Sequence, residues 1–217
     1  MKKLIVLCAV VLATCTLAYG QDKKPVQENR MLIAISAGPA FPVGDFAAKD
    51  VQTNTEAGLA KTGINMSLQF RYRIQAMFGL GASVSYAKHN MDVSSLQGMQ
   101  ADHWQYYSFL AGPYISTRVT DKLSFDLKSL IGIASVNAPK FSYNESILWD
   151  EQWKTTFALQ VGGNLRFNFS RNWCLLTSLD YNYMKPTLDI PDDGSGTTTA
   201  SQKMSNVTLN AGIGYRF

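Results

Sequence analysis

The chain ends in NVTLNAGIGYRF, residues 206–217, where apolar and polar residues alternate up to the last position. Successive side chains of a β-strand point to opposite faces, so this alternation gives the segment one apolar face. That face carries Val207, Leu209, Ala211, Ile213, Tyr215 and Phe217. In a soluble protein an apolar edge strand of this length invites aggregation. The segment therefore favours a strand whose apolar face meets lipid and whose edge pairs to close a barrel.

The first residues, 1–20, are typical of a cleavable secretory signal peptide. A basic start precedes an apolar core over residues 4–17, and small residues precede the expected cleavage site before Gln21. A membrane anchor is the alternative, but this apolar run is shorter than the roughly 20 residues that a spanning helix needs. Lipidation of Cys15 is a second alternative, although Thr14 before it is larger than the residue normally required there.

The rest of the chain fits one domain, and we expect a short N-terminal segment over 21–29 and a barrel domain over 30–217. Cys174 is the one cysteine after the signal peptide, which excludes an internal disulfide and a cysteine metal site. The formal charge of +4 includes two signal-peptide lysines, so the mature chain is near +2. This charge, without any basic run, does not indicate a nucleic-acid partner. The chain is then either a soluble β-protein or a membrane barrel.

Alternation recurs in eight segments along the chain. It is weak evidence in any single segment, but eight segments in succession are strong evidence for eight strands. The segments cover residues 31–41, 64–72, 78–86, 107–119, 123–133, 157–169, 173–183 and 206–217.

Connections between these segments alternate in length. Short connections lie near 74–76, 120–122 and 170–172, and long polar ones near 42–61, 88–103, 137–153 and 186–203. Outer-membrane barrels have short periplasmic turns and longer outer loops, whereas a soluble sandwich mixes loop lengths at both ends. The pattern predicts an all-β, eight-stranded, antiparallel, up-and-down transmembrane barrel.

Aromatic residues on the apolar faces gather at the two ends of the predicted strands. Two such belts, separated by aliphatic residues, are typical of the girdles at the two interfaces of a membrane barrel. The short-turn belt comprises Phe70, Tyr72, Phe167, Phe169, Trp173, Tyr215 and Phe217, and the long-loop belt Tyr86, Tyr107, Tyr181 and Tyr183.

The signal peptide, the eight alternating segments and the terminal GIGYRF together resemble a known family. The chain is similar to the small outer-membrane β-barrel proteins of Gram-negative bacteria, the OmpA/OmpX-like and PorT-like group. The resemblance implies a location in the outer membrane, contact with its lipid, and assembly by the barrel-assembly machinery. In that family the terminal aromatic strand is the assembly signal, which places the signal here at Ile213, Tyr215 and Phe217.

The opposite, inward faces of the predicted strands carry many charged residues. An eight-stranded barrel is about wide enough inside for side chains to fill it, so we expect an ion-paired plug in the lumen. The alternative is a narrow path that favours anions. The predicted lumen charge network comprises Arg71, Arg73, Arg118, Asp126, Lys128, Arg166, Asp180 and Arg216.

The two histidines, His89 and His103, lie at either end of the second long loop, with Asp92 and Asp102 nearby. A hydrolase would need a histidine base in contact with a nucleophile. Histidines at the loop end of a barrel are usually polar surface, and two of them without closer spacing are a weak metal signal. We therefore expect no catalytic, cofactor or metal site.

The function predicted from these observations is non-enzymatic. We expect an outer-membrane protein that supports envelope integrity or surface interaction through four extracellular loops, with no partner identified. One alternative is a small porin-like channel for ions or small solutes. The second alternative is an outer-membrane enzyme that uses the His89/His103 region.

Overall fold

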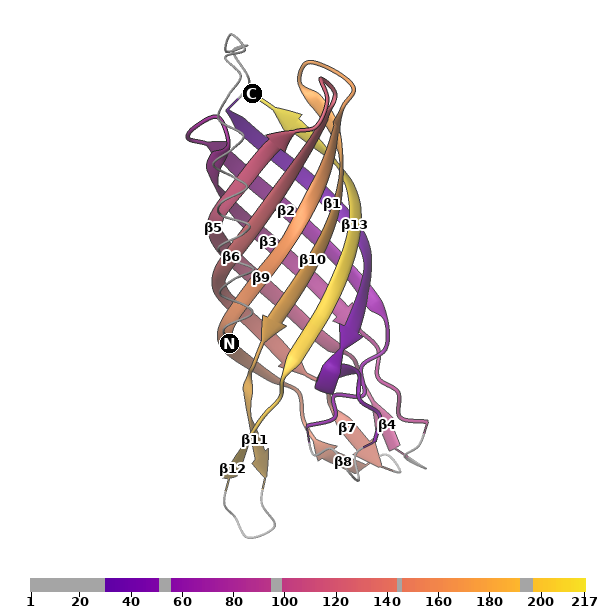
Figure 1. Cartoon of the computed structure of the whole chain (residues 1–217). Coiled ribbons are helices and arrows are strands. Elements are labelled where there is room, and N and C mark those ends of the chain that lie inside the picture. Colours follow the sequence, from indigo (N-terminus) through magenta and orange to yellow (C-terminus); the bar gives the residue numbers. More distant parts are fainter. Residues whose placement is uncertain (1–29, 51–55, 95–98, 144–145, 192–196) are drawn as a thin grey trace, which may run out of the picture.

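Eight long antiparallel strands pair into one closed barrel in a computed structural model of the chain (Figure 1). The structure describes residues 30–50, 56–94, 99–143, 146–191 and 197–217. The predicted signal peptide, Cys15 and the segment 21–29 lie outside the described residues. The barrel strands are β1 (Met31–Val43), β2 (Gly63–Arg73), β3 (Phe78–His89), β5 (Trp104–Arg118), β6 (Leu123–Ala138), β9 (Gln152–Asn168), β10 (Trp173–Met184) and β13 (Met204–Arg216).

The order of these strands around the barrel is β1-β13-β10-β9-β6-β5-β3-β2, so the last strand pairs with the first. The register of β1 and β13 runs from Leu32 opposite Arg216 to Val43 opposite Ser205. Beyond it, the Phe217 amide donates to the Met31 carbonyl at 3.1 Å, and the Met31 amide donates to the Phe217 carbonyl at 3.0 Å. Closure leaves no open barrel edge, which matters because unpaired backbone groups in hydrocarbon cost several kcal/mol each. The predicted eight-stranded antiparallel barrel is confirmed.

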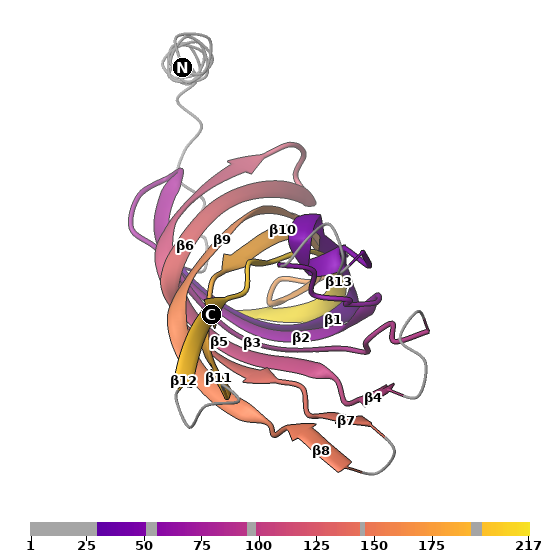
Figure 2. The ribbon, with the colours of Figure 1, turned by 90° about the horizontal axis from the view of Figure 1, so that it is seen from below.

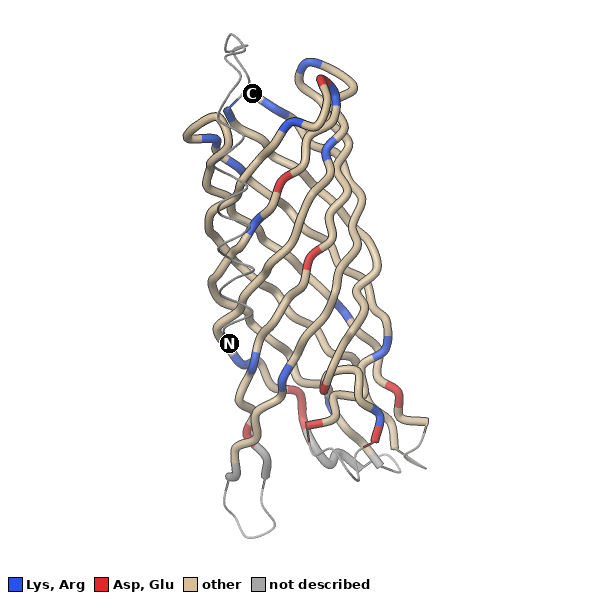
Figure 3. The backbone as a smooth tube through the Cα atoms, viewed as in Figure 1, with Lys and Arg blue, Asp and Glu red and all other residues tan. Residues whose placement is uncertain are grey.

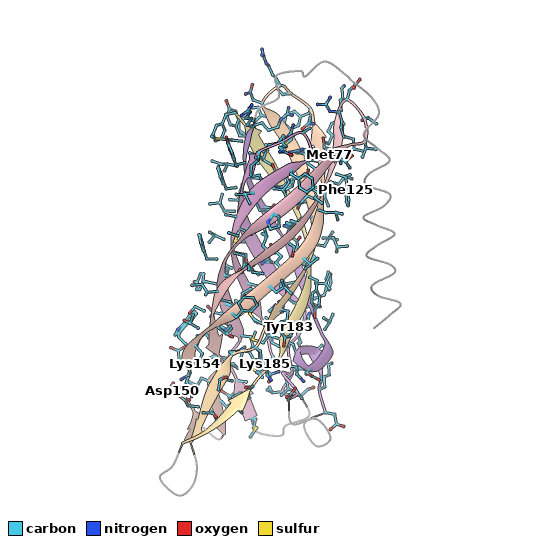
Figure 4. All side chains as sticks on the ribbon, turned by 60° about the vertical axis from the view of Figure 1, so that its left-hand side comes forward. Met77, Phe125, Asp150, Lys154, Tyr183 and Lys185 are labelled. Atoms are coloured by element: carbon cyan, nitrogen blue, oxygen red, sulfur yellow. The ribbon has the colours of Figure 1, made fainter. Side chains whose placement is uncertain are left out.

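The outer surface of the barrel is apolar. Neighbouring residues of β10 illustrate the alternation: Leu175 is 52% exposed on the outside, and Leu176 is 1% exposed inside. Figure 4 shows side chains projecting along the whole outer wall, with Phe125 toward one end and Tyr183 toward the other. No helix in the described ranges is long and apolar enough to cross a bilayer.

Both predicted aromatic belts lie on this outer surface. At the end with the short turns, the Trp173 and Tyr215 rings lie 5.0 Å apart between centroids. At the end with the long loops, the Tyr107 ring lies 4.9 Å from Tyr86 and 5.8 Å from Trp153. The belts and the apolar wall between them form the surface that a membrane barrel presents to lipid.

The long loops contain ordered structure that strand alternation did not predict. β11 and β12 form a hairpin beyond β10 and β13, and β4, β7 and β8 form a three-stranded sheet from the second and third long loops (Figure 1). A 3-10 helix, η1, follows β1. These elements are η1 (Gly44–Ala47), β4 (Met99–Ala101), β7 (Phe141–Tyr143), β8 (Ser146–Trp149), β11 (Thr187–Pro191) and β12 (Thr197–Ser201).

The barrel interior divides into two halves of different character. Toward the short turns it is polar and charged, but toward the long loops it is filled by an apolar cluster. The sequence predicted charged and polar residues on the inward face and did not predict this apolar cluster. Residues 104–110 and 130–136 carry aromatic or aliphatic side chains on both faces, interrupted by Gln105, Ser108 and Ser135, and this is the sequence signal for the inner cluster. Its members include Phe46, Trp104, Tyr106, Leu110, Leu130, Val136, Met184 and Met204.

Candidate functional site: the ion-paired lumen and its covered long-loop mouth

Two buried ion-pair groups occupy the polar half of the lumen. The first joins Lys128 on β6 to Asp180 on β10, with 3.0 Å between the Lys128 Nζ and the Asp180 Oδ2. Both side chains are almost inaccessible, at 4% and 2% exposure. Buried charges of this kind are stable only when they are paired, because each loses its hydration.

Gly162 on β9 makes this pair possible. In the sheet register Lys128 and Asp180 both lie opposite Gly162, so β9 runs between the two strands that carry the charges. A Cβ atom at Gly162 would lie 2.0 Å from the Asp180 Oδ1. A glycine here therefore lets the carboxylate lie over the β9 backbone and reach the lysine.

The second group spans the lumen. Asp126 on β6 pairs with Arg71 from β2 and lies 3.5 Å from the Arg166 Nη2 of β9. Asp126 is fully buried, and the Arg71 guanidinium lies 5.7 Å from the centroid of the Tyr114 ring. The Arg71 Nη2 also donates to the Gln69 Oε1 at 2.9 Å. These contacts tie strands on different sides of the barrel together through its interior.

The remaining three predicted lumen charges lie nearer the short-turn rim. Arg216 donates from its Nη2 to the carbonyls of Ser170 and Arg171, at 2.9 and 2.8 Å. Arg73 is half-buried and Arg118 is exposed. The structure thus brings five of the eight predicted residues into the two buried groups and places Arg73, Arg118 and Arg216 around the mouth of the lumen.

The opposite end of the lumen is covered by the loop that follows β1. Gly44 has a φ of 62°, a left-handed conformation that glycine adopts without strain, and the chain turns there into η1. Phe46 in η1 is fully buried, with its ring 5.9 Å from Trp104 and 5.1 Å from His89. Seen from the long-loop end, this segment lies across the barrel opening (Figure 2). In the sequence, the signal for this covering segment was a single large aromatic residue, Phe46, within a polar loop.

His89 belongs to this apolar closure. It is fully buried, its Nδ1 lies 3.1 Å from the Lys61 carbonyl, and its ring stacks 6.5 Å from Tyr106. The expectation that it is polar surface is wrong, because the Phe46 loop covers it. Its contacts with described residues are those of a core residue and include no nucleophile. Across the described residues, no group of three or more His, Cys, Asp and Glu side chains could hold a metal ion.

Ion pairs hold the covering loop in place from two sides. Asp92 lies 2.7 Å from the Lys49 Nζ and 3.3 Å from the Lys61 Nζ, and the Ser94 hydroxyl donates to it at 2.6 Å. The Lys49 ammonium and Ser94 hold the pKa of Asp92 well below its usual range. We refer to Lys49, Asp92 and Lys61 as the loop clasp.

Lys203, just before β13, holds the same loop from the other side. Its Nζ lies 2.6 Å from Glu56 and 3.4 Å from Asp45, and these carboxylates raise the pKa of Lys203. The Trp104 indole adds a hydrogen bond to the Gly58 carbonyl at 2.9 Å. The covering loop is therefore fastened to β5 and to the segment that precedes β13.

The three predicted assembly-signal residues lie on the lipid-facing side of the barrel end. Ile213 and Tyr215 are each 40% exposed, and Phe217 is 47% exposed. The Tyr215 and Phe217 rings stack with centroids 6.1 Å apart. These positions form a continuous apolar surface at the end of the closing strand.

Comparison with family models finds no match for this chain, and comparison with curated proteins finds none either. Solved structures with the same fold include three bacterial surface or outer-membrane proteins. The attachment invasion locus protein Ail of Yersinia pestis aligns with a TM-score of 0.53 at 23% identity, over 88% of this chain and 100% of Ail. Neisserial surface protein A aligns with a TM-score of 0.55 at 14% identity, over 86% of this chain and 97% of that protein.

The third is a major outer membrane protein of Thermus thermophilus, with a TM-score of 0.53 at 12% identity, over 86% of this chain and 99% of that protein. At these identities the likeness shows a shared fold. The closed barrel, its apolar outer wall and its two aromatic belts fit a lipid bilayer. The chain is therefore an eight-stranded β-barrel of the bacterial outer membrane, with the fold of the small OmpA/OmpX-like barrels.

Proposed function

We propose that this protein is a non-conducting, non-enzymatic outer-membrane barrel that acts through its long loops, in envelope integrity or in attachment to a surface. The obstructed lumen is the observation that carries the proposal. Arg71, Asp126 and Arg166 cross its polar half, and the cluster around Phe46 fills its outer half. A porin needs a continuous aqueous path, and the ion-paired layer and the apolar cluster would each block such a path.

Ordered loops give the proposal its second support. The β11–β12 hairpin and the β4-β7-β8 sheet are built from backbone pairing, and ion pairs fasten the first loop. Pre-ordered loops lose less entropy when they bind a partner than unstructured ones do. The outer strands of these small sheets also present edges to which an extended segment of a partner could pair.

The fold comparison suggests a probe for such a partner. The Yersinia pestis protein Ail is named for attachment and invasion, and it has been crystallised with sucrose octasulfate, a heparin analogue. For the present chain, we use this observation only to choose heparin as the test surface. Heparin is a sulfated polysaccharide against which attachment through the loops is readily measured.

The test compares the wild-type protein with a variant that lacks the outer hairpin. The Gln202 amide donates to the Pro186 carbonyl at 3.0 Å. These two residues are therefore close enough to be the first and last residues of a tight turn. Replacing residues 187–201 by Asn-Gly supplies the two-residue turn that suits such a position. Both proteins should migrate as folded, heat-modifiable barrels.

We expect no steady conductance from either protein in a planar bilayer. Cells carrying the wild-type protein should bind heparin-coated surfaces, or exclude a large antibiotic, better than cells carrying the hairpin variant. Steady open-channel conductance of the wild-type barrel would support the porin alternative instead. Equal attachment and equal antibiotic exclusion for the two strains would contradict a role of this hairpin.

A further inference from the structure

The outer hairpin, formed by β11 and β12, is a two-stranded sheet and therefore has two edges. In an antiparallel pair, every second residue bonds across to the partner strand, and the residues between them point their backbone groups outward. The Gln202 amide donates to the Pro186 carbonyl opposite it, so the bonded pairs of this hairpin lie at even residue numbers. The backbone groups of Asp189 and Thr199, which lie opposite each other, therefore point to the two edges.

The edge of β11 is closed by side chains. The Gln152 amide of β9 takes the place of a neighbouring strand, because its Nε2 donates to the Asp189 carbonyl at 2.7 Å and its Oε1 accepts from the Asp189 amide at 3.2 Å. Lys154 forms an ion pair with the Asp189 carboxylate. Pro191, further along β11, has no amide hydrogen to donate. Charge, proline and a covering group are the features that keep a sheet edge from pairing with another chain.

The edge of β12 has none of these features. Within the described part of the chain the small sheet ends at β12, and Thr199 at the middle of this strand is exposed. Residues 197–201 are Thr-Thr-Thr-Ala-Ser, without a charge or a proline, and Figure 3 shows no blue or red on β12. Threonine favours the extended conformation of a strand. We call the outward side of β12 the open edge.

The absence of charge on the open edge indicates which strand fits it. A charged peptide would meet no complementary charge along β12, whereas a second, identical strand can pair with it without like-charge repulsion. Antiparallel pairing of two identical strands is self-complementary, since each contributes the same surface. With Thr199 opposite Thr199 of the second copy, the outward backbone groups of each strand meet those of the other, and a Thr–Thr pair is a favourable cross-strand pair.

The direction of the hairpin determines where the second copy lies. Figures 1 and 4 show the hairpin projecting beyond the barrel at the long-loop end, along the general direction of the barrel axis. Antiparallel pairing along this direction turns the second barrel end over end, so the two barrels lie in two facing membranes. We propose that the open edge of β12 attaches one cell to another by pairing with the open edge of the same protein on the neighbouring cell. The proposal rests on the proposed function, because it requires the long loops to lie outside the cell, and it names their partner.

The strand is short, so one contact is weak and many copies on two facing surfaces must act together. The test therefore uses the whole barrel, reconstituted at high density in phosphatidylcholine vesicles, and follows vesicle clustering by light scattering. Thr199→Pro removes the outward amide hydrogen at the middle of the open edge and leaves the bonds between β11 and β12 in place. The matched control is Thr199→Val, which keeps the amide hydrogen and the branched side chain.

We expect the wild-type and Thr199→Val vesicles to cluster and the Thr199→Pro vesicles to stay as dispersed as vesicles without protein. Clustering of the proline variant to the wild-type extent would overturn the proposal, because it would show that the vesicles are joined by another surface.

Exchanging charges tests the pairing of Thr199 with its own copy. Vesicles that carry Thr199→Lys alone or Thr199→Glu alone should stay dispersed, since like charges meet at the middle of the paired strands, whereas a mixture of the two should cluster. Thr187→Lys and Thr187→Glu are the controls, because Thr187 is an exposed residue of β11 in the same hairpin, and each of these should cluster by itself. Rescue in the mixture cannot arise from misfolded variants. A mixture that stays dispersed would overturn the proposal.

Attachment to heparin distinguishes this inference from the proposed function. If wild-type vesicles stay dispersed while cells still attach to heparin through the hairpin, pairing with a second copy is overturned and the proposed function stands. If vesicle clustering, attachment and antibiotic exclusion are all independent of the hairpin, the inference is overturned together with the role proposed for this hairpin.

Discussion

Lys128 and Asp180 show how a single glycine determines an interior contact. The two residues are far apart in sequence, and they meet at 3.0 Å across Gly162 because that residue has no side chain in their way. The same principle applies to Asp126, which depends on arginines from two other strands. Each buried charge is therefore stable only through a partner that another strand supplies.

At the residue scale, we predict that removing one charge of the Lys128–Asp180 pair destabilises the barrel more than removing both charges. Lys128→Met leaves the Asp180 carboxylate buried without its cation and should lower the free energy of unfolding by about 3–5 kcal/mol. Combining Lys128→Met with Asp180→Asn, which keeps the shape of the carboxylate, should recover most of this loss. Urea unfolding of the refolded barrels in detergent measures both values. A double variant no more stable than the single one would contradict the buried-pair explanation.

Phe217 allows a second prediction at the residue scale. Deleting it removes one partly exposed side chain and its two backbone bonds to Met31, so the refolded barrel should lose only about 2 kcal/mol. The amount of barrel in the outer membrane should fall far more if the machinery reads this terminal residue. Membrane fractionation and urea unfolding give the two measurements. Proportionate losses in both would mean that Phe217 has only a structural role.

At the scale of elements, the first long loop behaves as part of the barrel core. η1 places Phe46 in the barrel mouth, and the loop clasp joins this loop to the segment after β3. The Asp92 amide also donates to the Leu59 carbonyl at 2.7 Å. A segment that looks like a polar connection in sequence is thus held near its start by the buried Phe46 ring and along its length by ion pairs of Asp45, Lys49, Glu56 and Lys61.

We predict that Asp92→Asn loosens this loop without unfolding the barrel. Hydrogen exchange of the Ala60 amide, which donates to the Phe46 carbonyl, should become faster, while exchange in β6 and β9 stays unchanged. Because the pKa of Asp92 is lowered in the folded protein, the wild-type clasp is fully present above the unfolded pKa of about 3.9 and is lost as the pH falls through the lower folded value.

The protection factor of the wild-type loop, which is its exchange rate corrected for the pH-dependent intrinsic rate, should therefore be the same at pH 5 and pH 7. The faster exchange of the variant should be seen at both pH values. If the wild-type protein loosened between pH 7 and pH 5, the clasp would not be the group that holds the loop.

The whole molecule has two distinct ends, joined by a wall that suits lipid. The short turns lie at one end, and the β11–β12 hairpin, the β4-β7-β8 sheet and η1 lie at the other (Figure 1). Strand pairing in the barrel wall has no free edge, so the backbone there is satisfied internally as a bilayer requires. An asymmetric barrel of this kind has one functional orientation, which we predict to be short turns in the periplasm.

The orientation is tested with single cysteines in a Cys174→Ser background, since Cys174, the one cysteine after the predicted signal peptide, is buried. Thr199→Cys in β12 and Asp121→Cys in a short turn both place the thiol at an exposed position. A membrane-impermeant maleimide should label the Thr199 variant on intact cells, and the Asp121 variant only after the outer membrane is opened. The opposite labelling pattern would reverse the topology.

The sequence by itself determined the strand number, the outward face and the alternation of turn lengths, because period-two patterning and local turn composition are properties of neighbouring residues. It also identified the charges that face inward. Tertiary structure alone decided which charges pair, since Arg71, Asp126 and Arg166 come from three strands whose register is set by closure of the barrel.

The tertiary structure likewise determined the burial of Phe46 and His89. Local sequence describes them as a loop residue and a polar rim residue, but folding of the first loop over the barrel mouth buries both. Whether such a loop folds inward depends on the space left by Ala87, Ala134 and Ala158 on the inner wall and on ion pairs with distant loops. Those are long-range contacts, which no local pattern in the chain encodes.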